Sequence, residues 1–307
     1  MSFYCVKEEM GLALNEILER VCANDRELLR KDISITWINY TNQNNNNDNL
    51  NLVKGFGFGI NNRKLIYPAS IVKLVYGLAA YYWIEKGRIL LTKEISDAVH
   101  NMFCFSSNDA TSFLVDMLTG TTSGPCIEGE SWENWKYQRA IINDWLKDFN
   151  WDELRGINCC QKTWDDCPYG REKEFYGHEN KNINLMSTDS TARIMQQIMI
   201  NIDYRQSNLN LKSSLKRNLN KTIFKLDPLN QVEGFLGEGI PENIHFWSKA
   251  GLMSKVRHDA AWWVNNNSVQ TLLVVFGNGR SFSQDKNLFP EIANAIYKYN
   301  NNNCSWH

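Results

Sequence analysis

A serine and a lysine lie one helical turn apart at the start of an apolar segment, where their side chains could act together. Ser70 and Lys73 belong to YPASIVKLVYGLAAYYWIEKG, residues 67–87, in which the other early positions are apolar or aromatic. Residues i and i+3 share a helix face, so the lysine amine could accept the serine proton if burial lowers its pKa. The alternative is structural: Ser70 caps the helix next to Pro68, and Lys73 extends to water.

Two later segments carry polar residues of the kinds that such a pair would need. FSSNDAT, residues 105–111, places Ser106 and Asn108 at the start of a predicted helix, and WSKAGLM, residues 247–253, places Lys249, Ala250 and Gly251 in a predicted strand. Together with the first segment they resemble, in order and rough spacing, the S-x-x-K, S-D-N and K-T-G motifs of class A β-lactamases and penicillin-binding proteins. Taken alone, each residue has an ordinary explanation, such as Ser106 serving as a helix N-cap.

The resemblance implies a serine acyl-transfer mechanism with defined roles. Ser70 would attack a carbonyl and become acylated, with Lys73 as its general base. The positive charge of Lys249 would help to lower the pKa of that base. Ser106 would pass a proton to the leaving group, and Asn108 would hold the substrate's amide carbonyl or fix Lys73 in place.

The same resemblance places a substrate along the strand at residues 247–253. The backbone N–H groups of Ser70 and Leu252 would form the oxyanion hole, and Ala250 and Gly251 would line the bound substrate. Ala250 stands where the motif has a threonine. A hydroxyl that β-lactamases direct at the substrate carboxylate is therefore missing.

Arg257 and His258, in the segment VRHDAAWW on the next predicted strand, are candidates to contact a substrate anion instead. Arginine in particular forms strong, geometrically defined hydrogen bonds with carboxylates. The alternative is that the two residues form a charge cluster with Asp259 at the edge of a sheet.

The glutamate that activates water in class A β-lactamases has no counterpart with the expected pattern. The corresponding stretch, residues 155–186, is long, and long irregular loops are usually functional. Glu172, in PYGREKEF, is the candidate for the water-activating base, with Glu174 second, because the preceding bend could aim one side chain. The alternative is that Glu172 pairs with Arg171 or Lys173 at the surface, and that Lys73 serves both half-reactions.

The order of predicted elements favours an α+β protein in which both ends of the chain build one antiparallel sheet. The resemblance to the β-lactamase/transpeptidase-like fold covers nearly the whole chain. We expect a single domain, residues 1–307, with a sheet lobe at about 1–92 and 226–307 and a helical lobe at about 93–225. Residues 42–51, NQNNNNDNLN, predict a polar hairpin loop. The predicted helices are 1–20, 67–87, 92–103, 107–118, 133–149, 187–200 and 290–299, and the predicted strands are 33–41, 52–62, 244–253, 259–266 and 269–277.

Composition excludes several other classes of protein. The 307 residues carry a formal net charge of −1, which gives no electrostatic basis for binding nucleic acid. No stretch is apolar for long enough to span a membrane, and no secretory signal is visible, so we expect a cytoplasmic protein, or a periplasmic one if a leader has been removed. The eight cysteines form no CxxC array, so we expect free thiols, no metal site and no cofactor.

These observations predict a serine acyl-hydrolase that acts on a small amide or ester, such as an amidase, peptidase or esterase with a small-molecule or peptide-like substrate. Two alternatives stay open: a true β-lactamase, and a penicillin-binding or sensor module that traps the acyl group. The segments SSNDAT, PYGRE and RHDAA are also similar to those of uncharacterised cyanobacterial serine hydrolases of this superfamily. The sequence does not indicate the oligomeric state.

Overall fold

The computed structural model describes residues 3–23, 26–40, 55–202 and 209–302. The predicted hairpin loop at 42–51 lies outside these described residues. Among them, no helix combines the length and the apolar character needed to cross a membrane.

Within the part of the chain that the structure describes, seven strands form one sheet in the order β1-β3-β2-β7-β6-β5-β4. All neighbouring pairs are antiparallel except β1 and β3, which run parallel. Both ends of the chain contribute strands, so the predicted α+β architecture is confirmed. The strands are β1 Tyr4–Val6, β2 Ile33–Tyr40, β3 Gly55–Ile60, β4 Lys216–Arg217, β5 His245–Met253, β6 Val256–Val264 and β7 Gln270–Asn278.

Both faces of the sheet are buried, and the residues of the central strands alternate between two apolar cores. Along β6, Ala260 and Trp262 pack into one core, whereas Ala261 and Trp263 pack into the other. This alternation follows from the two-residue period of a strand. It accounts for the apolar runs in the second half of β6 and in the middle of β7, because neither face is left to solvent.

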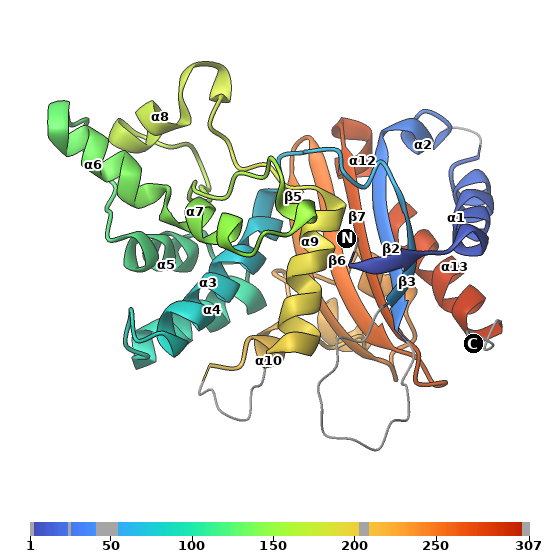
Figure 1. Ribbon diagram of the computed structural model, residues 1–307. Helices are drawn as coiled ribbons and strands as arrows, with labels where there is room; N and C mark the ends of the chain where they lie inside the picture. The colour runs from blue at the N-terminus through green and yellow to red at the C-terminus, as the bar shows by residue number, and fades with distance from the viewer. Residues whose placement is uncertain (1–2, 24–25, 41–54, 203–208, 303–307) are drawn as a thin grey trace.

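Helices from the two ends of the chain cover one face of the sheet, and the middle of the chain covers the other (Figure 1). The first group consists of α1 Glu8–Val21 and α13 Leu288–Asn302. The second group includes α3 Lys73–Glu85, which is buried on almost every side, and α9 Thr188–Gln196. Helix α3 is apolar all round, as expected of a helix enclosed by others.

Of the remaining helices within the described residues, four overlap segments that were predicted as helices, and five short ones were not predicted. They are α2 Leu29–Asp32, α4 Lys93–Cys104, α5 Asn108–Thr119, α6 Gly129–Arg139, α7 Ile141–Asp148, α8 Gly170–Tyr176, α10 Leu211–Leu215, α11 Lys221–Phe224 and α12 Arg280–Gln284, with short 3₁₀ turns at η2 Ala69–Val72, η3 Asp152–Leu154, η4 His178–Asn180 and η6 Leu236–Gly239, and a π-helical turn at η5 Gln197–Asn201. The segment predicted as one helix at 133–149 is divided at Ala140 into α6 and α7. Strand β1 lies within residues 1–20, which were predicted as one helix, whereas α1 begins only at Glu8. Three residues are too few to show a strand pattern of their own.

Candidate active site

The turn that carries Ser70 is held in an unusual backbone conformation between strand β5 and helix α3. Ala69 has a φ of 47°, in the left-handed region that alanine rarely adopts. His258 of β6 is hydrogen-bonded through Nε2 to the carbonyl oxygen of Tyr67, 3.0 Å away, and so fixes the approach to this turn. A residue held in such a conformation indicates that its surroundings over-determine it, which is common at functional sites.

Lys73 is fully buried and points at the Ser70 hydroxyl. Its Nζ lies 3.0 Å from Ser70 Oγ, 3.1 Å from Ser106 Oγ, 2.5 Å from the Ser106 carbonyl oxygen and 2.8 Å from Asn108 Oδ1. The predicted neighbourhood is therefore present. The structural alternative, in which the lysine extends to water, is wrong.

A second lysine contacts the Ser106 hydroxyl. Lys249, fully buried on β5, places its Nζ 3.0 Å from Ser106 Oγ. The amine also donates to Gln231 Oε1 at 2.6 Å and to its neighbour's carbonyl, that of Ala250, at 2.6 Å. Ser106 thus lies between the two lysines, the position that proton transfer to a leaving group would require.

Burial depresses the pKa of both amines. Loss of hydration lowers the pKa of Lys73 to about 7, against an opposing contribution from the negative charge of Asp165. Loss of hydration also brings the pKa of Lys249 well below its usual value, helped by the positive charges of Lys73 and Arg217. An amine with a pKa near 7 is half neutral at neutral pH and can accept a proton.

Ser106 owes its position to a tight turn before α5, where its own φ is 56°. The helix N-cap is the next residue, Ser107, whose hydroxyl accepts the backbone N–H of Ala110 at 3.1 Å. Capping by Ser107 explains the local fold and leaves the Ser106 hydroxyl to the lysines. The alternative that Ser106 caps the helix is therefore wrong.

Strand β5 passes directly beside the Ser70 turn. A Cβ at Gly251 would lie 3.0 Å from the Pro68 carbonyl oxygen and 3.3 Å from the Ser70 backbone nitrogen. Only glycine allows this approach without a shift of the backbone. Leu252, the next residue, is half exposed, whereas Ala250 is buried.

The structure gives Arg257 and His258 neighbours other than the predicted substrate anion. Arg257 is buried, and its guanidinium donates to the backbone carbonyls of Gly234, Phe282 and Ser283 at 2.8–3.1 Å. His258 is fully buried, and loss of hydration lowers its pKa to about 4, so it is neutral at neutral pH. Both side chains are bonded to backbone carbonyls, His258 to that of Tyr67, so the predicted anion contact stays a prediction that these contacts do not favour. They also do not form an edge cluster, since β6 is an inner strand.

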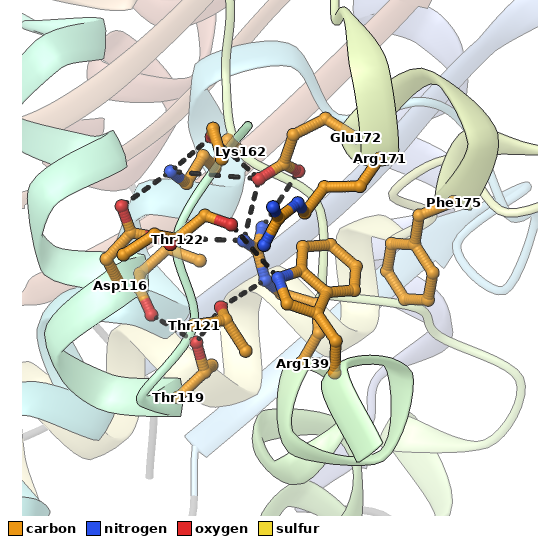
Figure 2. Close-up of polar contacts among 12 residues, drawn as sticks. Asp116, Thr119, Thr121, Thr122, Arg139, Lys162, Arg171, Glu172 and Phe175 are labelled. Atoms are coloured by element: carbon orange, nitrogen blue, oxygen red, sulfur yellow. Dashed lines mark hydrogen bonds and ion pairs between the residues drawn. The ribbon is translucent and has the colours of Figure 1, made fainter. Parts of the chain in front are cut away.

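Glu172 is fully buried in an ion cluster within the helical layer (Figure 2). Its two oxygens accept from Arg139 at 2.7 and 3.0 Å, and Ser123 donates to one of them at 2.8 Å. The predicted alternative of a surface pair with Arg171 or Lys173 is therefore wrong. Among the described residues, no hydrogen bond or ion pair links Glu172 to Ser70 or Lys73, so its role as the water-activating base stays a prediction that its contacts do not favour.

The acid that does reach the catalytic centre is Asp165, which the sequence analysis did not single out. Its Oδ1 accepts from Asn108 Nδ2 at 2.5 Å. Gln231 was also missed: it receives Lys249 and donates to the carbonyls of Phe103 and Cys104 at 2.8 and 3.0 Å. Neither residue belongs to a motif. For Asp165, the stretch at 155–186 contains several acidic residues, and nothing in the sequence distinguishes the one that reaches the site.

The described residues contain no cluster of three or more histidine, cysteine or acidic side chains able to hold a metal ion. Seven cysteines fall within the described ranges, and all seven are free thiols. The vicinal pair Cys159 and Cys160 is buried.

Comparison with known proteins places this geometry in a family context. A beta lactamase from Burkholderia vietnamiensis is similar with a TM-score of 0.61 at 10% identity, covering 95% of this chain and 97% of that chain. A beta-lactamase from Sphaerobacter thermophilus gives a TM-score of 0.59 at 14% identity, covering 94% and 97%. A mutant of PBP-A, solved as an acyl-enzyme complex with penicillin G, gives a TM-score of 0.58 at 12% identity, covering 95% and 97%. At these identities the likeness concerns the fold.

The family assignment rests on sequence. No curated protein sequence matches the chain. A family model described as the beta-lactamase enzyme family matches residues 94–300, which is about two thirds of the chain and includes the second and third motifs. The chain therefore belongs to the beta-lactamase enzyme family, within the superfamily of β-lactamase-like and penicillin-binding-protein-like serine hydrolases.

Proposed function

We propose that the protein is a serine acyl-hydrolase that cleaves a small amide or ester through an acyl-enzyme on Ser70, with Lys73 as general base. The observation that carries this proposal is the 3.0 Å contact between Lys73 Nζ and Ser70 Oγ at a site where burial lowers the lysine pKa to about 7. A serine hydroxyl is a weak nucleophile at its own pKa and needs an adjacent base.

In the acylation step, neutral Lys73 accepts the Ser70 proton as Oγ bonds to the substrate carbonyl carbon. The backbone N–H groups of Ser70 and Leu252 stabilise the oxyanion, consistent with the close approach of β5 to the Ser70 turn. The tetrahedral intermediate collapses when the bond to the leaving group breaks. Ser106 donates a proton to that group and recovers one from Lys73, which lies 3.1 Å away.

In the deacylation step, water attacks the Ser70 ester while Lys73 accepts the water proton. The new intermediate expels Ser70 Oγ, which regains a proton, and a carboxylic acid leaves. This second use of Lys73 follows from the contacts of Glu172, whose carboxylate is bonded to Arg139. The same contacts favour a second candidate function, an acyl-trapping module, if Lys73 activates water poorly.

The substrate anchor that penicillins use is weak at this site. Ala250 provides no hydroxyl, and the guanidinium of Arg257 is bonded to backbone carbonyls. A hydrogen bond to a charged group contributes roughly 1.5–3 kcal/mol, or about one to two powers of ten in rate or affinity. We therefore expect ordinary penicillins to be poor substrates.

The test is incubation with a fluorescent penicillin and with p-nitrophenyl acetate, followed by intact-mass measurement and turnover assays. Ester turnover that Ser70→Ala abolishes supports the hydrolase. A stable penicillin adduct without turnover supports the trapping module, and rapid penicillin turnover supports a true β-lactamase. If Ser70→Ala folds normally and keeps more than a few per cent of the activity, the nucleophile assignment is wrong.

A further inference from the structure

Residues 162–172, here called the strap, are held at both ends by buried ion pairs of the helical layer. At the first end, Lys162 Nζ donates to Asp116 Oδ2 at 2.7 Å and to Ser123 Oγ at 2.8 Å. At the second end, Glu172 receives both terminal nitrogens of Arg139. Figure 2 shows the two ends meeting in one cluster. The side chains of Lys162, Arg139 and Glu172 are at most 2% exposed, whereas Asp116 is partly exposed at 25%.

Between these ends the strap brings Asp165 into contact with Asn108. Asp165 is exposed, and its Oδ1 lies 2.5 Å from Asn108 Nδ2. The other end of the Asn108 amide, Oδ1, accepts from Lys73 at 2.8 Å. Three side chains thus form a line from the strap to the proposed general base. The adjacent Asp166 is also exposed and has no hydrogen bond or ion pair to any residue that the structure describes.

The chemistry of this line fixes the orientation of the amide. A carboxylate only accepts hydrogen bonds, and an amide has one accepting and one donating end. Asp165 therefore keeps the amide nitrogen of Asn108 toward the strap and its oxygen toward Lys73. The amide nitrogen has two hydrogens, so one remains for a substrate carbonyl.

We propose that Asp165 is a positioning residue of the Ser70 centre, which holds the Asn108 amide oxygen on Lys73 and keeps a negative charge near that amine. This inference rests on the proposed function, because it assigns Asp165 a role in the same reaction. Among the described residues, no hydrogen bond or ion pair joins Asp165 to Ser70, so it acts through Asn108.

The charges around Lys73 show what the carboxylate contributes. Among the described residues, the side chains hydrogen-bonded to Lys73 are those of Asn108, Ser106 and Ser70, all of them neutral. From β5 it faces the amine of Lys249 across the shared hydroxyl. Asp165 is thus the anionic group that raises the pKa of Lys73 against burial. Without its charge, the amine would lose its proton at a lower pH.

Two substitutions separate the charge of Asp165 from its hydrogen bond. Asp165→Asn keeps an oxygen that can accept from Asn108 and removes the charge, whereas Asp165→Ala removes both. We expect the acid limb of the pH profile of kcat/KM for p-nitrophenyl acetate to move to lower pH by roughly half a unit in Asp165→Asn. In Asp165→Ala we expect the same shift and, in addition, a plateau lowered by about tenfold from loss of orientation. Asp166→Asn, the matched control, should reproduce the wild-type profile.

A measurement without substrate keeps the test independent of turnover. In protein labelled with ¹³C-lysine, the Cε signal of Lys73, assigned through Lys73→Arg, should titrate at lower pH in Asp165→Asn than in the wild type and in Asp166→Asn. Superimposable titrations and superimposable rate profiles in all three proteins would overturn the inference. That outcome differs from failure of the proposed function, which would show as retained activity in Ser70→Ala.

Discussion

Lys73 has exchanged its hydration shell for the oxygens of Ser70, Ser106 and Asn108. These oxygens can accept hydrogen bonds from the ammonium form, but they carry no full charge to balance it. Desolvation therefore dominates, and it lowers the pKa of the amine to about 7.

The rate of Ser70 acylation should report this pKa. Because the general base must be neutral, kcat/KM for p-nitrophenyl acetate should rise with pH through about 7 and reach a plateau above it. Lys73→Arg keeps a cation that does not deprotonate and should lose about 10²–10⁴ in rate. A flat profile between pH 6 and 8, or an active Lys73→Arg variant, would contradict the assignment of the base.

Substitution of Glu172 distinguishes a structural role of this residue from a catalytic one. Glu172→Gln leaves Arg139 buried without its bidentate partner, and breaking a buried ion pair from one side typically costs about 3–5 kcal/mol. We expect that loss in the free energy of unfolding, measured by urea denaturation, without accumulation of a Ser70 adduct. Glu174→Gln, an exposed neighbour, should change stability by less than about 0.5 kcal/mol. A normally stable Glu172→Gln variant that accumulates the adduct would instead identify Glu172 as the water-activating base.

The contacts of some site residues could be predicted from the sequence, and those of others could not. Ser70 and Lys73 are neighbours on one turn, so their contact follows from local geometry. The contacts of Asp165 and Gln231 depend on the path of irregular segments, which no periodic pattern encodes. The side on which the Arg257 side chain lies could have been predicted from the two-residue period of a strand. Arg257 lies an even number of residues from Ala261 and Trp263 along β6, and these two pack on the face away from Ser70.

At the level of elements, the site depends on how closely strand β5 approaches the Ser70 turn. Gly251→Ala would place a methyl group 3.0 Å from a carbonyl oxygen and force the strand and the turn apart. A misplacement on the order of 1 Å can cost about 10² in rate. We therefore expect kcat/KM to fall by at least about tenfold while the unfolding midpoint changes little. Met253→Ala, on the same strand and half exposed, is the control and should remain active.

The elements themselves were largely predictable, and the departures have physical causes. The strands β5, β6 and β7 and the helices α4, α5 and α9 appear where apolar periodicity predicted them. Strand β6 begins at Val256, three residues before its predicted start at Asp259, because Arg257 and His258 are polar residue types although both are buried. Burial of these side chains is offset by hydrogen bonds that only the folded chain supplies.

For the whole molecule, the sheet joins two apolar cores, so we expect the two cores to unfold together. Residues of β6 and β7 alternate between the core beneath the helical layer and the core beneath α1 and α13. We therefore expect tryptophan fluorescence, far-ultraviolet circular dichroism and Ser70 acylation to decline together in urea. Ile296 is fully buried on α13, on the face away from Ser70. Ile296→Ala should lower the free energy of unfolding by about 2–5 kcal/mol and shift all three urea midpoints down together. Separate transitions would show that the two layers unfold independently.

Lys73 and Lys249, which share the Ser106 hydroxyl, should also link the binding of an anionic ligand to the uptake of a proton. The product of acyl hydrolysis is a carboxylate, and an anion placed beside two amines with depressed pKa values favours their charged forms. The pair should then draw a proton from the buffer as the anion binds, with the two amines titrating as one coupled unit. Calorimetry of product binding in buffers with different ionisation enthalpies would count that proton, and the affinity for the product would fall as the pH rises above 7.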